Sequence, residues 1–312
     1  MSWILLTVIA QFISAIVAII DKHIVSDETK YPKPFVYAFY TCLISGAWIV
    51  VYFIGFIPFA SDGLHIPTFE NVKSPTLEVV ALSFLSAYTF FTALTSMFTA
   101  LKDHDASDVI PVIGAVSALG SYGLGYFFLD TILAPNFTLG VVLLALGTFI
   151  VSRLRFPLTT ALLTLYSGLF FALHYVSIKG LFMTTQSFDN GFFWSRIAFV
   201  FFALTLLMIP NYWERVRDQT KVMSWQARSI IIANKLLAGV STILILKATD
   251  QGDVAVVQAL GGLQFVFILL LGIFVSYEKG GHPVGNLHDR RITLQKAIFV
   301  AIISLGFLVL FI

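Results

Sequence analysis

Long runs of apolar residues, separated by short polar stretches, dominate the pattern of this chain. A helix that crosses a hydrocarbon core of about 30 Å needs roughly 20 apolar residues, because each residue rises about 1.5 Å. By this criterion the sequence predicts ten transmembrane helices. They cover residues 3–21, 35–57, 77–101, 108–128, 136–152, 158–178, 192–210, 226–247, 253–275 and 294–312.

The boundary between the third and fourth helices depends on one short charged stretch, Lys102-Asp-His-Asp105. A single long helix would place these charges in lipid, which is energetically expensive. Two helices are therefore expected here, and totals of nine or eleven helices are the alternatives.

Two pairs of residues indicate an internal repeat. Lys22 closes the first predicted helix and Lys179 closes the sixth, while Phe35 opens the second and Phe192 opens the seventh at the same spacing. A third match relates the stretch that begins at Ala100 to the one that begins at Ile245. Together they align helices one to five with helices six to ten.

This alignment divides the chain into residues 1–156 and 157–312, with five predicted helices in each half. Because five is odd, the two halves must cross the membrane in opposite directions. Such inverted repeats are typical of secondary transporters, in which two near-equivalent arrangements give inward-open and outward-open states.

Two short motifs add a family resemblance. Phe274-Val-Ser-Tyr-Glu278-Lys, followed by a final helix, resembles the end of the repeat in EamA-type members of the drug/metabolite transporter superfamily, and Phe127-Phe-Leu-Asp130 looks like its first-half counterpart. This chain departs from the pattern by an insertion from Gly281 to Arg291 and by an aspartate in the first half. The resemblance implies ten helices, a five-plus-five inverted repeat and metabolite transport.

Composition supports the membrane assignment. The 312 residues are 58% hydrophobic and 12% charged, with a mean hydropathy of +0.90. Soluble domains carry about 25% charged residues, so too little polar surface is left here to face water. We expect an all-α integral membrane protein, a monomer or homodimer in the cell membrane, or in the inner membrane where there are two.

Charge and cysteine content exclude other classes. A net charge of +2 without a basic cluster argues against nucleic acid as a partner. The single cysteine, Cys42, permits neither a disulfide framework nor a Cys-x-x-Cys metal site.

The distribution of lysine and arginine predicts orientation. Loops after odd-numbered helices hold fourteen of these residues and loops after even-numbered helices hold three. Positive loops favour the cytoplasm, which places both termini outside. The EamA resemblance implies that both termini lie inside.

Lys235 is the most informative polar residue, because it lies near the centre of the eighth predicted helix beside Asn234. An intramembrane lysine costs about 2.5–3.5 kcal/mol and should face a cavity or the bundle interior. We interpret it as an anchor for a substrate carboxylate or phosphate. The alternative is a structural ion pair with Glu278 or Asp130.

Other polar residues at depth have two interpretations each. His174 could couple transport to protons, or could be a neutral histidine hydrogen-bonded between helices, which we favour. Tyr175 and Tyr88 could contact a ligand or fill the bundle. Arg196 lies about five residues into its helix, where it could contact a substrate, although extension of the side chain to the interface explains it adequately.

Gln258 and Gln264 lie in the ninth predicted helix, where interhelical hydrogen bonds are the alternative to ligand contact. Since they are six residues apart on one helix, they should point in different directions. At most one of them is expected to line a given cavity.

Motifs of enzyme catalysis are absent from the sequence, which contains no Gly-x-Ser-x-Gly, His-Glu-x-x-His or phosphate-binding Gly-rich loop. We therefore expect no catalytic residue, metal or cofactor. The leading hypothesis is a secondary transporter of small polar or amphipathic metabolites, with amino acids or organic anions as the best guess and the proton as one candidate coupling ion. The alternatives are an intramembrane enzyme that combines His174 with Asp130 or Glu278, and a lipid flippase.

Overall fold

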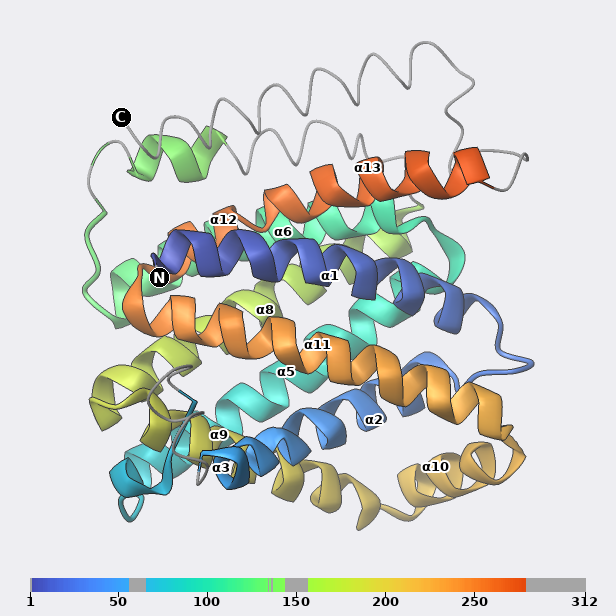
Figure 1. Cartoon of the computed structure of the whole chain (residues 1–312), viewed down its shortest axis with the longest axis horizontal. Helices are drawn as coiled ribbons and strands as arrows, with labels where there is room; N and C mark the ends of the chain where they lie inside the picture. Colours follow the sequence, from blue (N-terminus) through green and yellow to red (C-terminus); the bar gives the residue numbers. More distant parts are fainter. Residues whose placement is uncertain (1, 56–65, 134, 136, 144–156, 279–312) are drawn as a thin grey trace.

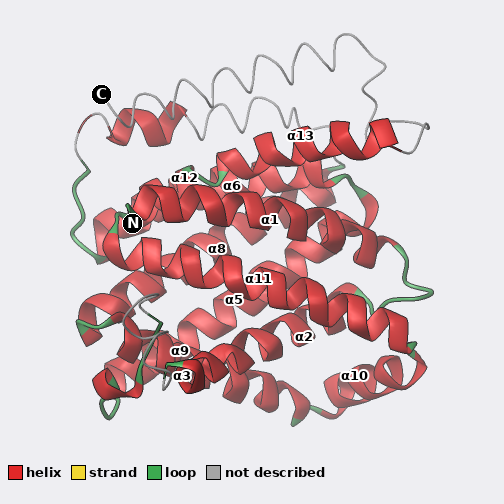
Figure 2. Ribbon diagram, viewed as in Figure 1, coloured by secondary structure: helices red, strands yellow, loops and turns green. Residues whose placement is uncertain are grey.

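The computed structural model describes residues 2–55, 66–133, 135, 137–143 and 157–278. Within these ranges the chain forms helices and no β-strand (Figure 2). Eight helices are long and apolar enough to cross a membrane. Most of the long helices run roughly along one common direction (Figure 1), which is the arrangement of a helical membrane protein.

The first half begins with two long helices and a short connecting segment. Its elements are α1 (Trp3–Ser26), α2 (Pro34–Ala47), η1 (Trp48–Val50), α3 (Val51–Ile54), η2 (Phe69–Asn71), α5 (Leu77–Asp103) and α6 (Ala106–Phe128). Residues 137–143 are also helical. The α2, η1 and α3 segments together make one membrane-length unit, Pro34–Ile54.

The second half is described up to residue 278. Its elements are α8 (Leu158–Thr185), α9 (Phe188–Leu207), α10 (Pro210–Val222), α11 (Trp225–Gln251), α12 (Val254–Ala259) and α13 (Gly262–Glu278). The α12 and α13 segments belong to one apolar unit that is interrupted near Leu260 and Gly261.

Polar side chains define where several of these helices begin. The side chains of Thr76, Ser187, Ser224 and Asp253 accept hydrogen bonds from backbone N–H groups in the first turns of α5, α9, α11 and α12. A first-turn N–H has no partner within its own helix, so such caps stabilise the helix end.

Eight of the ten predicted transmembrane helices correspond to described helices. The expected break between the third and fourth is confirmed, because α5 ends at Asp103 and α6 begins at Ala106. Of the predicted helix at 136–152, residues 137–143 are helical and the rest lie outside the described residues. The predicted helix at 294–312 and the insertion from Gly281 to Arg291 also lie outside them.

One helix was not expected from the sequence. The sequence predicts a loop between the helices at 192–210 and 226–247, because the residues there form no apolar run, whereas the structure forms α10. This helix is largely exposed, carries Arg215, Arg217 and Lys221, and lies at the end of the bundle where α1 and α2 are connected (Figure 1). The backbone N–H of Lys33 donates to Gln219 Oε1 at 2.8 Å and ties that connection to α10.

The helices of the two halves pack on one another reciprocally. In the first half α1 packs against α11 and α13, and in the second half α8 packs against α5 and α6. The second helices of the two halves, α2 and α9, also pack together. This arrangement brings eight helical segments around a common interior space.

Two lysines cap the ends of other helices in the same way. Lys22 Nζ donates to the carbonyls of Leu101 and Lys102 at 2.8 and 3.2 Å, at the end of α5. Lys179 Nζ donates to the carbonyls of Thr249, Asp250 and Gly252, each at 2.9 Å, at the end of α11. Each lysine thus satisfies carbonyls that have no partner within their own helix.

Candidate functional site

A cavity of about 180 Å³ lies between the two halves, enclosed by α1, α2, α5, α6, α8, α11, α12 and α13. Its wall combines hydrocarbon and polar groups. The apolar members include Phe90, Leu94, Met97, Ile110, Ile113 and Phe171. The hydroxyl, amide and charged members are Gln11, Ser14, Asp21, Thr41, Ser45, Ser117, Tyr175, Lys235, Ser241, Thr242, Gln258 and Gln264.

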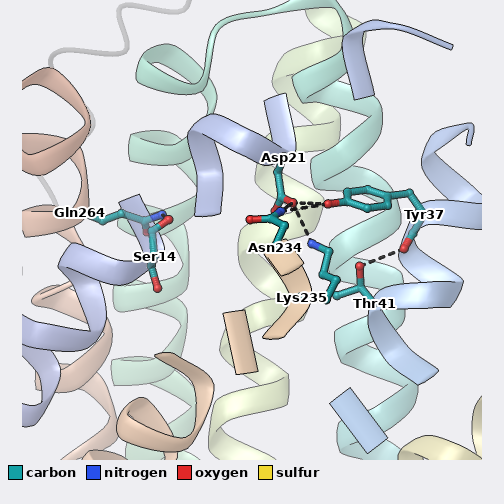
Figure 3. Close-up of polar contacts among 7 residues, drawn as sticks. All are labelled: Ser14, Asp21, Tyr37, Thr41, Asn234, Lys235 and Gln264. Carbon is teal, nitrogen blue, oxygen red and sulfur yellow. Dashed lines mark hydrogen bonds and ion pairs between the residues drawn. The ribbon is translucent and has the colours of Figure 1, made fainter. Parts of the chain in front are cut away.

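The charged part of the wall is an ion pair between Asp21 of α1 and Lys235 of α11. Lys235 Nζ lies 2.7 Å from Asp21 Oδ1, and the two side chains are 3% and 6% exposed. Tyr37 donates its hydroxyl to the same oxygen at 2.5 Å, and Asn234 Nδ2 donates to it at 2.6 Å (Figure 3). Asp21 Oδ1 thus accepts from three donors, one on α2 and two on α11.

Aromatic rings complete the surroundings of the Lys235 ammonium. Its nitrogen lies 4.3 Å from the ring centre of Tyr37 and 5.1 Å from that of Phe98. Ring faces attract cations at such distances. Lys235 is therefore held by one carboxylate oxygen and two rings, and α1 and α11 are positioned side by side by this contact.

Neutral polar groups lie along the same face of α1, one to three turns before Asp21. Ser14 Oγ is 2.6 Å from Ser241 Oγ, and Gln264 Nε2 donates to the Ser14 carbonyl at 3.1 Å (Figure 3). Gln11 lines the cavity, but its side chain makes no hydrogen bond within the described part of the chain. Its spacing from Ser14 and Asp21 places all three on one helix face.

Four residues predicted from the sequence line this cavity: Lys235, Tyr175, Gln258 and Gln264. The expectation that only one of the two glutamines would do so is wrong. The helix is interrupted near Leu260 and Gly261, so a six-residue spacing across the break does not set the directions that a continuous helix would give. Ser117 donates to Gln258 Oε1 at 3.2 Å, which is the predicted kind of interhelical bond.

The other four predicted residues, Tyr88, His174, Asn234 and Arg196, do not line it. Tyr88 is 49% exposed, and its ring contacts Phe170 and Phe202 on the outside of the bundle. His174 is buried, and its Nδ1 lies 2.9 Å from the carbonyl oxygen of Ser86, which is the interhelical contact that we favoured. Asn234 is buried behind Lys235 and acts on the ion pair by its bond to Asp21.

Arg196 does not reach the interface, so that expectation is wrong. Its side chain is 2% exposed, because α9 begins at Phe188, earlier than predicted, and Arg196 lies deeper in the bundle. The guanidinium carbon lies 4.9 and 4.5 Å from the ring centres of Phe192 and Phe199. One nitrogen, Nη1, donates to the Ser45 carbonyl at 3.1 Å.

Sequence reasoning missed Asp21 as the partner of Lys235. Asp21 was the last residue of the predicted helix at 3–21, whereas α1 continues to Ser26 and so places Asp21 inside the bundle. Of the two expected partners, Asp130 is exposed beyond the end of α6, and the side chain of Glu278 lies outside the described part. The signal available was chemical: a buried lysine requires a carboxylate nearby.

The described residues do not bring together the side chains that a metal site or the considered catalytic set would need. Among the described residues, no group of three His, Cys, Asp or Glu side chains could hold a metal ion. Asp130 is exposed while His174 is enclosed, so the catalytic set considered for an intramembrane enzyme is not brought together by this part of the chain. What the cavity can do is bind a small solute through a charged pair, amides and hydroxyls.

No protein-family model and no curated protein matches the chain. One solved structure, described only as a crystal structure of a protein, is similar over 96% of this chain and 97% of that one. The TM-score is 0.58 at 14% sequence identity. This similarity shows a shared fold over almost the full length of both chains.

Proposed function

We propose that this protein is a secondary transporter that moves small polar or amphipathic metabolites across the cell membrane by alternating access. The observation that carries this proposal is the cavity of about 180 Å³, which has a charged pair in its wall and lies among membrane-length helices. A structural ion pair alone would not need a cavity beside it.

Contributions from both halves of the chain support the proposal. Asp21 and Gln11 come from α1, whereas Lys235 comes from α11 and Gln264 from α13. Transporters built from inverted repeats bind their substrates at the interface between the repeats, since movement of one repeat against the other then exposes the site to either side.

The proposal includes a ten-helix, five-plus-five inverted repeat of the EamA type. Two observations support it. Lys22 and Lys179, which the sequence alignment pairs, end α5 and α11 by the same kind of contact. The packing of α1 against α11 has its counterpart in the packing of α8 against α5.

Two glycines of α6 allow the cavity to be tested directly. A side chain at Gly114, which lines the cavity, or at Gly123, which does not, would meet no other atom at its Cβ position. Leucine is a better helix former than glycine, so neither substitution should weaken the helix. Gly114→Leu places new atoms in the cavity, and Gly123→Leu is its matched control.

The experiment measures uptake of labelled amino acids and small organic acids into proteoliposomes. We expect saturable uptake of at least one compound, reduced about tenfold or more by Gly114→Leu, since one excess methylene in a pocket already costs about 10–200-fold. Gly123→Leu should transport like the wild type. Uptake equal to that of protein-free liposomes for every compound, or an unaffected Gly114→Leu variant, would contradict the proposal.

A further inference from the structure

The charges in the cavity wall sum to zero. Among the described residues that line the cavity, only Asp21 and Lys235 carry a charge, and they are paired at 2.7 Å. The other polar members are amides and hydroxyls. A solute with a net charge would therefore bring an uncompensated charge beside a buried ion pair that is already neutral, which is costly.

We propose that Asp21 sets the charge selectivity of the cavity. Because Asp21 neutralises Lys235, the cavity excludes small anions and binds solutes without net charge. It binds best a zwitterion, which offers both an ammonium and a carboxylate group. This proposal rests on the transport function proposed above and specifies the class of substrate. The expected substrate is therefore a zwitterion rather than the organic anion that an unpaired Lys235 would favour.

Both members of the ion pair have hydrogen-bonding capacity left for such a zwitterion. All three donors to Asp21 converge on Oδ1, and its other oxygen, Oδ2, accepts no hydrogen bond from the described residues. Oδ2 can thus accept from a ligand ammonium. Lys235 has three N–H donors, of which one points to Asp21, so its ammonium can also donate to a ligand carboxylate.

A second, independent observation points to a ligand in the same cavity. Gln11 is 5% exposed and lines the cavity, yet its side-chain amide makes no hydrogen bond within the described ranges. Buried amides normally find partners, and one that has none suits a bound polar group. Its amide offers a donor and an acceptor without adding charge.

Cavity size and the hydrocarbon wall limit the solute. The volume of about 180 Å³ exceeds the roughly 150 Å³ that holds benzene, but it lies below the roughly 300 Å³ of pockets for drug-sized ligands. Phe90, Leu94 and Met97 provide an apolar surface. An amino acid with a medium-sized hydrocarbon side chain matches these dimensions, and leucine is a suitable probe.

Three compounds that carry the same isobutyl group separate the effect of charge from that of shape. Leucine is a zwitterion, 4-methylpentanoate is the corresponding anion without the amine, and 3-methylbutylamine is the cation without the carboxylate. Binding of each to the purified full-length protein is measured by calorimetry at neutral pH. We expect the wild type to bind leucine about tenfold or more tightly than either ion, because each ion loses one charge-assisted hydrogen bond.

Substitutions at the ion pair should change this preference in a defined way. Asp21→Asn keeps the shape but leaves Lys235 uncompensated, so 4-methylpentanoate should become the preferred compound. The double variant Asp21→Asn/Lys235→Met holds no charge in the cavity wall, and the preference among the three compounds should fall to about twofold or less. Asp27→Asn, the same exchange at the end of α1 and outside the cavity, is the matched control.

If Asp21→Asn does not fold, the double variant still tests the proposal, because the double variant leaves no unpaired buried charge at this ion pair. The proposal is overturned if the wild type binds 4-methylpentanoate as tightly as leucine, if leucine does not bind at millimolar concentration, or if the folded Asp21 variants keep the wild-type preference.

Flux of the same compounds into proteoliposomes distinguishes this proposal from the transport function. Transport of 4-methylpentanoate in preference to leucine would overturn the charge selectivity and leave transport standing. Selective binding of leucine without flux of any compound would support the selectivity and contradict transport.

Discussion

Among the described residues, two cations are buried in the bundle, and they are accommodated differently. Lys235 pairs with the Asp21 carboxylate, borders the cavity and is also surrounded by two rings. Arg196 of α9 forms no ion pair with any described residue, and it contacts two phenylalanine rings, the Ser195 hydroxyl and the Ser45 carbonyl of α2. Both side chains are almost fully enclosed.

The difference follows from the chemistry of the two groups. An ammonium is a compact, strongly hydrated charge, whereas a guanidinium is planar, delocalised and more weakly hydrated, and stacks on aromatic rings. Rings and carbonyls are therefore adequate partners for Arg196, while Lys235 requires a counter-charge. The sequence places Lys235 near the centre of its helix and Arg196 near the start of its own, whereas both side chains are buried in the structure. Of the two, only Lys235 and its partner line the cavity.

The largest effect is expected when the ion pair is broken. Lys235→Met leaves the Asp21 carboxylate without its counter-charge, which should lower the free energy of unfolding by about 3–5 kcal/mol. Adding Asp21→Asn removes the stranded charge and should restore most of this loss. Unfolding by SDS titration in mixed micelles measures both values, and a single variant as stable as the double one would show that the pair contributes nothing.

A smaller effect is expected at the other cation. Arg196→Met removes two cation–ring contacts and two hydrogen bonds, but it also removes a buried charge and strands no carboxylate. We expect a loss of about 1–2 kcal/mol by the same titration. Transport activity should stay within about twofold of the wild type, since Arg196 does not line the cavity. A complete loss of transport in a folded Arg196→Met variant would contradict the claim that only the Lys235 site takes part in transport.

The smallest effect is expected from a single hydroxyl. Tyr37→Phe removes one of the three donors to Asp21 Oδ1 and should cost about 0.6–1.7 kcal/mol, as interhelical hydrogen bonds in membranes do. Tyr52→Phe, which removes a bond to the Asp189 carbonyl, is a control without a charged partner. If both variants lost the same stability, the charge on Asp21 would add nothing to its hydrogen bonds.

Most of the fold could be predicted because an apolar run of membrane length is a local property of the sequence. The stretch from Lys102 to Asp105 was correctly placed between two helices for the same reason. Helix α10 was missed, since its polar residues give no hydrophobic signal, although Pro210 suits a first helical turn. The interruption at Leu260 and Gly261 was missed because the residues around it stay apolar.

The candidate site could be predicted only in part. Lys235 was found because a charge deep in an apolar run is visible in the sequence. Its partner was not, because Asp21 is far away in the chain and nothing local indicates that α1 and α11 are neighbours. The depth of Arg196 was within reach, since Ser187 is a typical residue for a helix N-cap and marks the earlier start of α9.

The single cysteine makes the native chain suitable for labelling. Cys42 is fully buried between α2 and α9, with its thiol directed at the Phe199 carbonyl, so a water-borne maleimide has no access to it in the folded protein. A cysteine placed at exposed Lys30 or Lys73 would be the sole reactive thiol. The segments that carry these residues lie at opposite ends of the bundle (Figure 1). Labelling of intact cells with an impermeant reagent would therefore show directly which end faces outward.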